Sequence, residues 1–136
     1  MNERQKAELL HHLAHWQLSG YSELEIHHGD CIGADAEFHD LCLQSWPAAS
    51  VRVVLHPPTV ATKRAFKESP GQTDLDPLPY LQRNHAIVDS VDAMLGAPKG
   101  MSEELRSGTW ATIRYSRKRG VPLRILWPQK PEAARP

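Results

Sequence analysis

The sequence predicts an α/β fold, a Rossmann-like three-layer sandwich with a mainly parallel sheet of four or five strands. Two observations lead to this prediction. Short apolar, β-branched runs alternate with longer segments of helical period, and several of these runs end in turns rich in glycine or proline. Strands that alternate with helices imply right-handed crossovers and a parallel sheet covered on both faces. The 136 residues suffice for one domain, expected over residues 1–128, followed by a disordered tail at 129–136.

Charge balance and cysteine content narrow the functional classes. Sixteen basic and sixteen acidic residues give a formal net charge of zero, so nucleic acid is not expected as a partner. The two cysteines, Cys31 and Cys42, make neither a disulfide framework nor a zinc pattern and fit a reduced cytosol. No apolar run has the length of a membrane span or of a signal peptide. We therefore expect a cytoplasmic protein with no membrane partner, no metal and no cofactor.

The first predicted helix covers residues 3–18. Leucines and Trp16 recur on one face, and Ser19-Gly20 supplies the stop signal. His11 and His15 in this helix have the spacing of a metal pair. No carboxylate or cysteine nearby in the sequence completes a site, which favours a solvated helix face.

The later elements follow from the same two patterns. Apolar, β-branched runs indicate strands, and apolar residues at helical spacing indicate helices. Residues 68–79 hold one glycine and three prolines without periodicity, which indicates a loop that is either a lid or a flexible insertion. The predicted strands are 24–27, 51–55, 93–97 and 123–127, and the predicted helices are 34–45, 80–91 and 111–120, with a short basic segment at 63–67 that is compatible with a helix.

A glycine-containing turn joins the first predicted strand to the second helix. Gly29 and Gly33 allow close backbone approach or positive φ angles, and the helix beyond them directs its first amides to the mouth of the sheet. Asp30 and Asp35 add carboxylates, which favour a ligand with hydroxyl or amino donors, such as a ribose or a base. The alternative is that Asp35 caps or charges the first turn of the helix.

A second turn, Arg106 to Trp110, opens the last predicted helix. Small residues and hydroxyls at Ser107-Gly108-Thr109 leave amides unpaired at the positive end of a helix dipole, which suits a phosphate. The same residues are also ordinary helix caps. A cation is disfavoured at this helix end, so either Glu103 or Glu104 neutralises Arg106, or a bound anion does.

Further candidates lie where other predicted elements begin or end. His56, fixed by two prolines after a strand, either hydrogen-bonds a ligand and acts as acid or base, or caps its loop. Asn84 on an apolar helix stripe requires hydrogen-bond partners. Arg83 beside it reaches either a phosphate or a surface salt bridge. The predicted ligand-binding residues are Gly29, Asp30, Gly33, Ala34, Asp35, His56, Arg83, Asn84, Pro98, Arg106, Ser107, Gly108 and Thr109.

Together these motifs resemble the SLOG superfamily, which joins the DNA-processing protein A fold to the "lonely guy" proteins. The resemblance is to small bacterial and phage members and covers about residues 24–128. It implies a Rossmann-like domain that binds nucleotides or nucleotide-derived ligands, with the Gly33 turn and the Ser107 turn facing phosphate and sugar. The motifs that carry it are residues 28–35, His56-Pro57-Pro58, Arg83-Asn84 with residues 87–89, Pro98, and Ser107-Gly108-Thr109-Trp110 with Thr112.

Two departures from that family shape the functional prediction. Lonely guy enzymes carry a catalytic glutamate three residues after the threonine of their Gly-Thr motif, but Trp110-Ala111-Thr112 supplies none after Thr109. Glycosidic cleavage requires a carboxylate, for which Asp30, Asp35 and Glu104 are the candidates. We therefore predict binding, as sensing or sequestration, of a nucleotide-like small molecule. The alternative is a nucleotide N-glycosidase, resembling a phosphoribohydrolase, that cleaves base from ribose phosphate.

The second departure concerns the start of the fold. Relatives resemble a chain with a strand before the first helix, whereas this sequence opens inside that helix. A sheet without this strand would have an exposed gap between edges. The start lies upstream, or a partner chain or a changed strand pairing fills the gap. A homo-oligomer is accordingly among the expectations.

Overall fold

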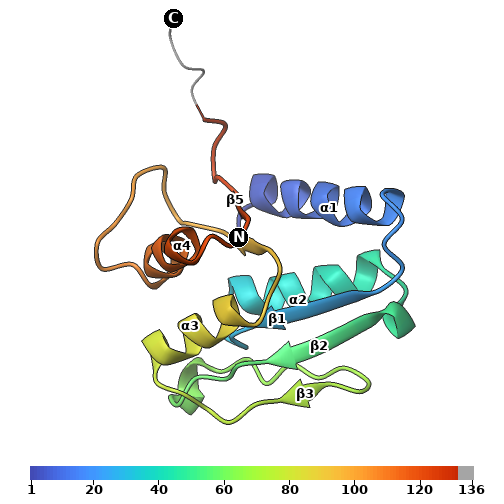
Figure 1. The fold of residues 1–136 in the computed structure, drawn as a ribbon, viewed down its shortest axis with the longest axis horizontal. Coiled ribbons are helices and arrows are strands. Elements are labelled where there is room, and N and C mark those ends of the chain that lie inside the picture. The colour runs from blue at the N-terminus through green and yellow to red at the C-terminus, as the bar shows by residue number, and fades with distance from the viewer. Residues whose placement is uncertain (132–136) are drawn as a thin grey trace, which may run out of the picture.

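The computed structural model describes residues 1–131, in which helices and strands alternate along the chain (Figure 1). The last five residues of the expected tail, 132–136, lie outside the described residues. The α-helices are α1 (Glu3–Leu18), α2 (Ala34–Ser45), α3 (Tyr80–Asp89) and α4 (Gly108–Arg119), and short 3-10 helices cover Ala48–Ser50 and Ala61–Lys63. The strands are β1 (Leu24–His28), β2 (Val51–Leu55), β3 (Thr73–Asp74), β4 (Met94–Gly96) and β5 (Leu123–Ile125).

Local sequence explains where the outer helices begin and end. The side chain of Asn2 accepts a hydrogen bond from the Gln5 amide while the Gln5 side chain accepts one from the Asn2 amide, a reciprocal capping box. Ser107 caps α4, and Gly120 ends it in a left-handed conformation with φ of 72°. The prediction that α4 begins at 111 was wrong, because the serine cap starts the helix three residues earlier.

Among residues 1–131, β1 to β5 pair in parallel but form two sheets, and an isolated antiparallel bridge joins Cys31 to Arg64. One sheet has the order β1-β2-β3, and the other contains β4 and β5. The α/β class with parallel strands is thus confirmed. The single sheet of four or five strands was wrong for the described residues, because β1 and β4 each have a strand partner on one side only.

The main hydrophobic core lies under α1. Leu9 and Leu13 of this helix are fully buried and pack with Ile26 of β1 and with Leu126, which follows β5. Complete burial of one such leucine contributes about 1.5–3 kcal/mol to folding. Helix α1 therefore holds the two sheets together through one shared core. The other buried members of this core are Cys42, Trp46, Val51, Val53 and Leu55.

The region between β2 and α3 departs most from expectation. Its basic residues do not form a helix, because the 3-10 turn ends at Lys63 and Phe66 adopts a positive φ of 55°. The expected loop at 68–79 contains β3, which pairs with Val54 and Leu55 of β2. This segment is therefore attached to the sheet edge. Within residues 1–131, no helix combines the length and the apolar character needed to cross a membrane.

Candidate functional site

A cavity of about 900 Å³ lies between the two sheets. Its walls include β1 and β4 and the first turns of α2, α3 and α4. We call the part formed by Gly29, Asp35, Tyr80, Arg83, Asn84, Gly108 and Thr109 the polar end of the cavity. Among the predicted ligand-binding residues, the wall includes Gly29, Ala34, Asp35, Arg83, Asn84, Gly108 and Thr109, and it does not include Asp30, Gly33, His56, Pro98, Arg106 or Ser107.

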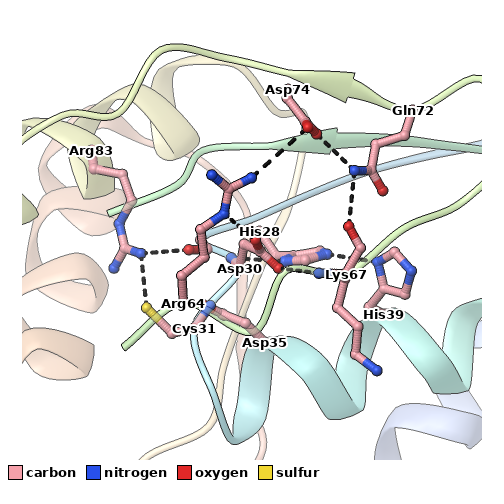
Figure 2. Close-up of polar contacts among 11 residues, drawn as sticks. His28, Asp30, Cys31, Asp35, His39, Arg64, Lys67, Gln72, Asp74 and Arg83 are labelled. Carbon is pink, nitrogen blue, oxygen red and sulfur yellow. Dashed lines mark hydrogen bonds and ion pairs between the residues drawn. The ribbon is translucent and has the colours of Figure 1, made fainter. Parts of the chain in front are cut away.

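Arg83 is the central cation of the polar end. Its side chain is 3% exposed, and Nη1 donates to the carbonyl of Gly29 at 2.8 Å and to Sγ of Cys31 at 3.1 Å (Figure 2). Nε donates to Oδ1 of Asn84 at 3.1 Å. None of these acceptors is a carboxylate, and within the described part of the chain Nη2 has no hydrogen-bond partner. A buried guanidinium held by neutral acceptors retains positive charge and a donor for a ligand.

Two glycines make room for this arrangement. A Cβ atom at Gly29 would lie 2.1 Å from Nη1 of Arg83, so no larger residue fits while the guanidinium stays in place. A Cβ atom at Gly108 would lie 2.7 Å from Cε1 of Tyr80. The Tyr80 ring in turn lies 4.5 Å from the Arg83 guanidinium carbon, a cation–π contact. Tyr80 therefore joins the Gly29 turn to the start of α4.

Gly29→Ala should displace Arg83 and lower the free energy of unfolding by about 2 kcal/mol, because buried hydrogen bonds from a charged donor are lost. Urea denaturation measures the effect. Gly100→Ala is the matched control, since a Cβ atom at Gly100 meets nothing within 4 Å. Equal stability of the two variants would show that Arg83 does not need the space above Gly29.

The start of α4 presents free backbone donors. The hydroxyl of Ser107 accepts a hydrogen bond from the Trp110 amide at 3.3 Å, and its carbonyl accepts one from the Ala111 amide. Ser107 thus acts as the helix cap. Within residues 1–131, the amides of Gly108 and Thr109 have no partner, and both residues line the cavity. These two N–H groups at the positive helix end suit an anion.

Asp35 brings a carboxyl group to the same end. Its Oδ2 accepts a hydrogen bond from the Cys31 amide at 3.2 Å, across the Gly29 turn. Burial raises the pKa of Asp35, and this effect is opposed by backbone hydrogen bonds from Cys31 and Gly29 and by the charge of Arg83. Asp35 is therefore a hydrogen-bonding group for a ligand and the carboxyl candidate that the cavity wall contains.

Asp30, a second carboxyl candidate, serves a different purpose. It is fully buried at a φ of 51°, and its Oδ2 accepts a hydrogen bond from Nε of Arg64 at 2.7 Å (Figure 2). Its Oδ1 accepts from the Lys67 amide at 2.9 Å, and its carbonyl accepts from the Ala65 amide. Asp30 thus fastens the 64–67 segment to the Gly29 turn. Its carboxylate is occupied by protein donors and is outside the cavity wall.

Behind Asp30 runs a buried chain of hydrogen bonds through two histidines. The Asp30 amide donates to Nδ1 of His28 at 3.0 Å. His28 Nε2 lies 2.9 Å from Nδ1 of His39, and His39 Nε2 lies 3.3 Å from the carbonyl of Glu68. Because the Glu68 carbonyl only accepts, His39 donates to it and His28 donates to His39. Nδ1 of each ring therefore acts as an acceptor in this chain of hydrogen bonds, and burial lowers the pKa of His28 to about 3.

The other predicted residues lie away from the polar end. His56 is 3% exposed and pairs with His27 at 2.9 Å, and burial lowers its pKa to about 4. The carbonyl of Pro98 accepts a hydrogen bond from the Gln5 side chain at 2.7 Å, which anchors α1. Arg106 is exposed. Glu103, one of the two glutamates expected to neutralise it, forms its ion pair with Arg114 instead. Glu104, the third carboxyl candidate, is exposed outside the cavity wall.

Tyr80 is a site residue that the sequence analysis did not single out. It begins α3 and contacts both Arg83 and Gly108 while 48% of its surface is exposed. The sequence could have indicated Tyr80, because it lies three residues before Arg83 and residues at i and i+3 are neighbours on a helix.

No group of three or more His, Cys, Asp or Glu residues in the described chain could hold a metal ion. Comparison of the chain with protein-family models, curated proteins and solved structures finds no match.

Proposed function

We propose that the polar end of the cavity binds a nucleotide or nucleotide-derived ligand, for sensing or sequestration. The observation that carries this proposal is the buried Arg83 guanidinium, whose hydrogen-bond acceptors within residues 1–131 are neutral and whose Nη2 has no partner there. Across the Tyr80 ring, the amides of Gly108 and Thr109 supply further donors. A phosphate group accepts from both sources and neutralises the buried cation.

Neutral and acidic groups beside Arg83 favour a ligand larger than inorganic phosphate. Asp35 accepts hydrogen bonds from hydroxyl or amino groups. Asn84 also lines the cavity, and its side-chain nitrogen donates no hydrogen bond within residues 1–131. A cavity of about 900 Å³ has room for a sugar and a base beside the phosphate. We include in this proposal a Rossmann-like sandwich and the resemblance to the SLOG superfamily. Both imply that the ligand binds at the carboxyl ends of the strands.

Calorimetric titration with nucleoside mono- and diphosphates and with ADP-ribose tests the proposal. We expect at least one to bind, and we expect Arg83→Gln to weaken that binding about 10- to 100-fold, the loss of one charged hydrogen bond. The matched control is Arg114→Gln, which removes an arginine that pairs with Glu103 outside the cavity wall and leaves affinity unchanged. Circular dichroism establishes that both variants fold. Absence of binding by all these ligands to the unaltered chain would refute the proposal.

Asp35 favours a second function, hydrolysis of the N-glycosidic bond of a nucleotide. Its carboxyl lies in the cavity wall near Arg83, and burial raises its pKa, which is the direction that favours a proton donor. The test is chromatography of a reaction with nucleoside monophosphates, in which this function predicts free base and predicts that Asp35→Asn abolishes its release. Binding without release of base removes this alternative and leaves the binding function intact.

A further inference from the structure

A second cavity lies between α2 and the connection that follows β2. Its walls are His39, Asp40, Leu43 and Gln44 of α2 and the segment 65–68, and its volume is about 460 Å³. This volume is within the range of small-molecule sites. We call this cavity the α2 groove. Its wall shares no residue with the wall of the cavity between the two sheets, so it is independent of the function proposed above.

Polar contacts hold the 65–68 segment in a fixed position beside α2. The Ala65 amide donates to the carbonyl of Asp30 at 2.7 Å, and the Lys67 amide donates to Oδ1 of the same residue at 2.9 Å (Figure 2). At the other end of the segment, the carbonyl of Glu68 accepts a hydrogen bond from Nε2 of His39 at 3.3 Å. Because Asp30 and His39 are both buried, the α2 groove is preformed in the fold.

Phe66 lies in the middle of this segment and has an unfavourable backbone conformation. Ala65 and Lys67 on either side of it both direct their amides at Asp30, an arrangement that uses left-handed backbone. Phe66 accordingly has a φ of 55°. Glycine or asparagine adopts this conformation readily, whereas a bulky side chain does so at a cost in stability. The turn itself therefore does not explain a phenylalanine at this position.

Burial of the Phe66 ring does not offset this cost. The ring is 58% exposed, and the guanidinium carbon of Arg64 lies 4.7 Å from its centroid. A cation–π contact at an exposed site stabilises only weakly, and Arg64 is also held by Asp30. The ring lines the α2 groove. A strained backbone that presents an exposed aromatic ring to a cavity is typical of a binding site.

The other side chains of the groove indicate the class of ligand. Nζ of Lys67 lies 2.9 Å from Oδ1 of Asp40, so these two charges compensate each other. Within residues 1–131, the carboxylate of Glu68 has no ion-pair partner, and Leu43 and Phe66 supply apolar surface to the same wall. An uncompensated negative charge beside an aromatic ring suits an organic cation.

We propose that the α2 groove binds an organic ammonium ion that carries an aromatic ring. The ring of the ligand stacks on the face of Phe66 opposite Arg64 and contacts Leu43. The ammonium group donates a charge-assisted hydrogen bond to the carboxylate of Glu68. Asp30 maintains the site, because it holds the backbone on both sides of Phe66.

Titration with phenethylamine, followed through the backbone amide signals in two-dimensional NMR, tests the proposal. We expect saturable shifts at residues 65–68 and at the facing turns of α2, with a Kd of about 1 mM for a ligand of this size. Phenylacetate has the same ring with the opposite charge, and cyclohexylethylamine has the same charge without an aromatic ring. Both should bind at least about 5-fold more weakly than phenethylamine.

Two variants separate the contributions of the ring and the charge. Phe66→Asn removes the ring and suits the left-handed backbone, so the chain should fold and bind phenethylamine at least about 10-fold more weakly. Glu68→Gln keeps the size of the side chain and removes its charge, and should weaken binding about 5-fold or more. The matched control is Val60→Asn, which replaces an exposed apolar residue of the same connection outside the groove wall and should leave the affinity unchanged.

The absence of saturable shifts with phenethylamine overturns the proposal, and so does equal binding of phenylacetate. Unchanged affinity of Phe66→Asn also overturns it, because the ring would then not be the binding surface. If Phe66→Asn does not fold, Glu68→Gln decides: weaker binding of phenethylamine supports the proposal, and unchanged binding overturns it.

Discussion

Replacement of Asp30 by alanine should lower the free energy of unfolding by about 3 kcal/mol. The substitution removes a fully buried carboxylate and leaves Nε of Arg64 and the Lys67 amide without their acceptor. Alanine also tolerates the positive φ of this position less well than aspartate. Chemical denaturation with urea measures the loss.

Asp30→Asn separates charge from hydrogen bonding at the same site. Asparagine keeps an acceptor for the Lys67 amide and tolerates a positive φ, so we expect a smaller loss of about 1–2 kcal/mol. Asp76→Ala, at an exposed position in the same connection, is the surface control and should stay within about 0.5 kcal/mol of the unaltered chain. If Asp30→Ala is as stable as this control, the carboxylate does not fasten the 64–67 segment.

Acidification should destabilise the fold well above the pH at which most carboxylates titrate. His28 is neutral in the folded chain with a pKa lowered to about 3, whereas an unfolded histidine has its ordinary value of 6.5. The unfolded chain therefore binds the proton first. This stabilisation is fully present above pH 6.5 and is lost progressively as pH falls toward 3. The loss is about 2 kcal/mol between pH 6.5 and 4.5.

His56 acts in the same direction, because its pKa is lowered to about 4. Denaturation midpoints measured across this pH range give the dependence. His56→Gln should reduce the slope, since one of the two histidines no longer titrates. His15→Gln, on the exposed face of α1, should leave the slope unchanged. A flat stability profile between pH 6.5 and 5 would contradict the lowered pKa values of His28 and His56.

The sequence predicted the regular elements where local signals agree. Strand β2 was predicted with its exact ends because residues 51–55 are apolar and β-branched, and α1 because its apolar spacing ends at Ser19-Gly20. Strand β3 was missed, because Thr73 and Asp74 are exposed and carry no apolar pattern. The pairing that makes them a strand comes from β2, about twenty residues earlier, and no local signal reports it.

The sequence predicted the turns that carry site residues, but not the contacts between those residues. Gly29, Arg83 and Gly108 were named from their positions at element ends, and the structure places all three in one cavity wall. The different roles of Asp30 and Asp35 were not predictable. They depend on Arg64, which lies 34 residues beyond Asp30 in the chain, and on which carboxyl group faces the cavity.

Tyr80 packs directly against Gly108, and Arg83 packs directly against Gly29. Each contact makes the effect of a substitution at one position depend on the residue at the other. In each pair one residue occupies the space that its partner leaves empty, so a side chain gained at the glycine requires the partner side chain to shift or to be shortened. Substitutions within a pair should therefore be strongly non-additive. A side chain at Gly108 therefore requires the Tyr80 ring to shift or a smaller residue at position 80.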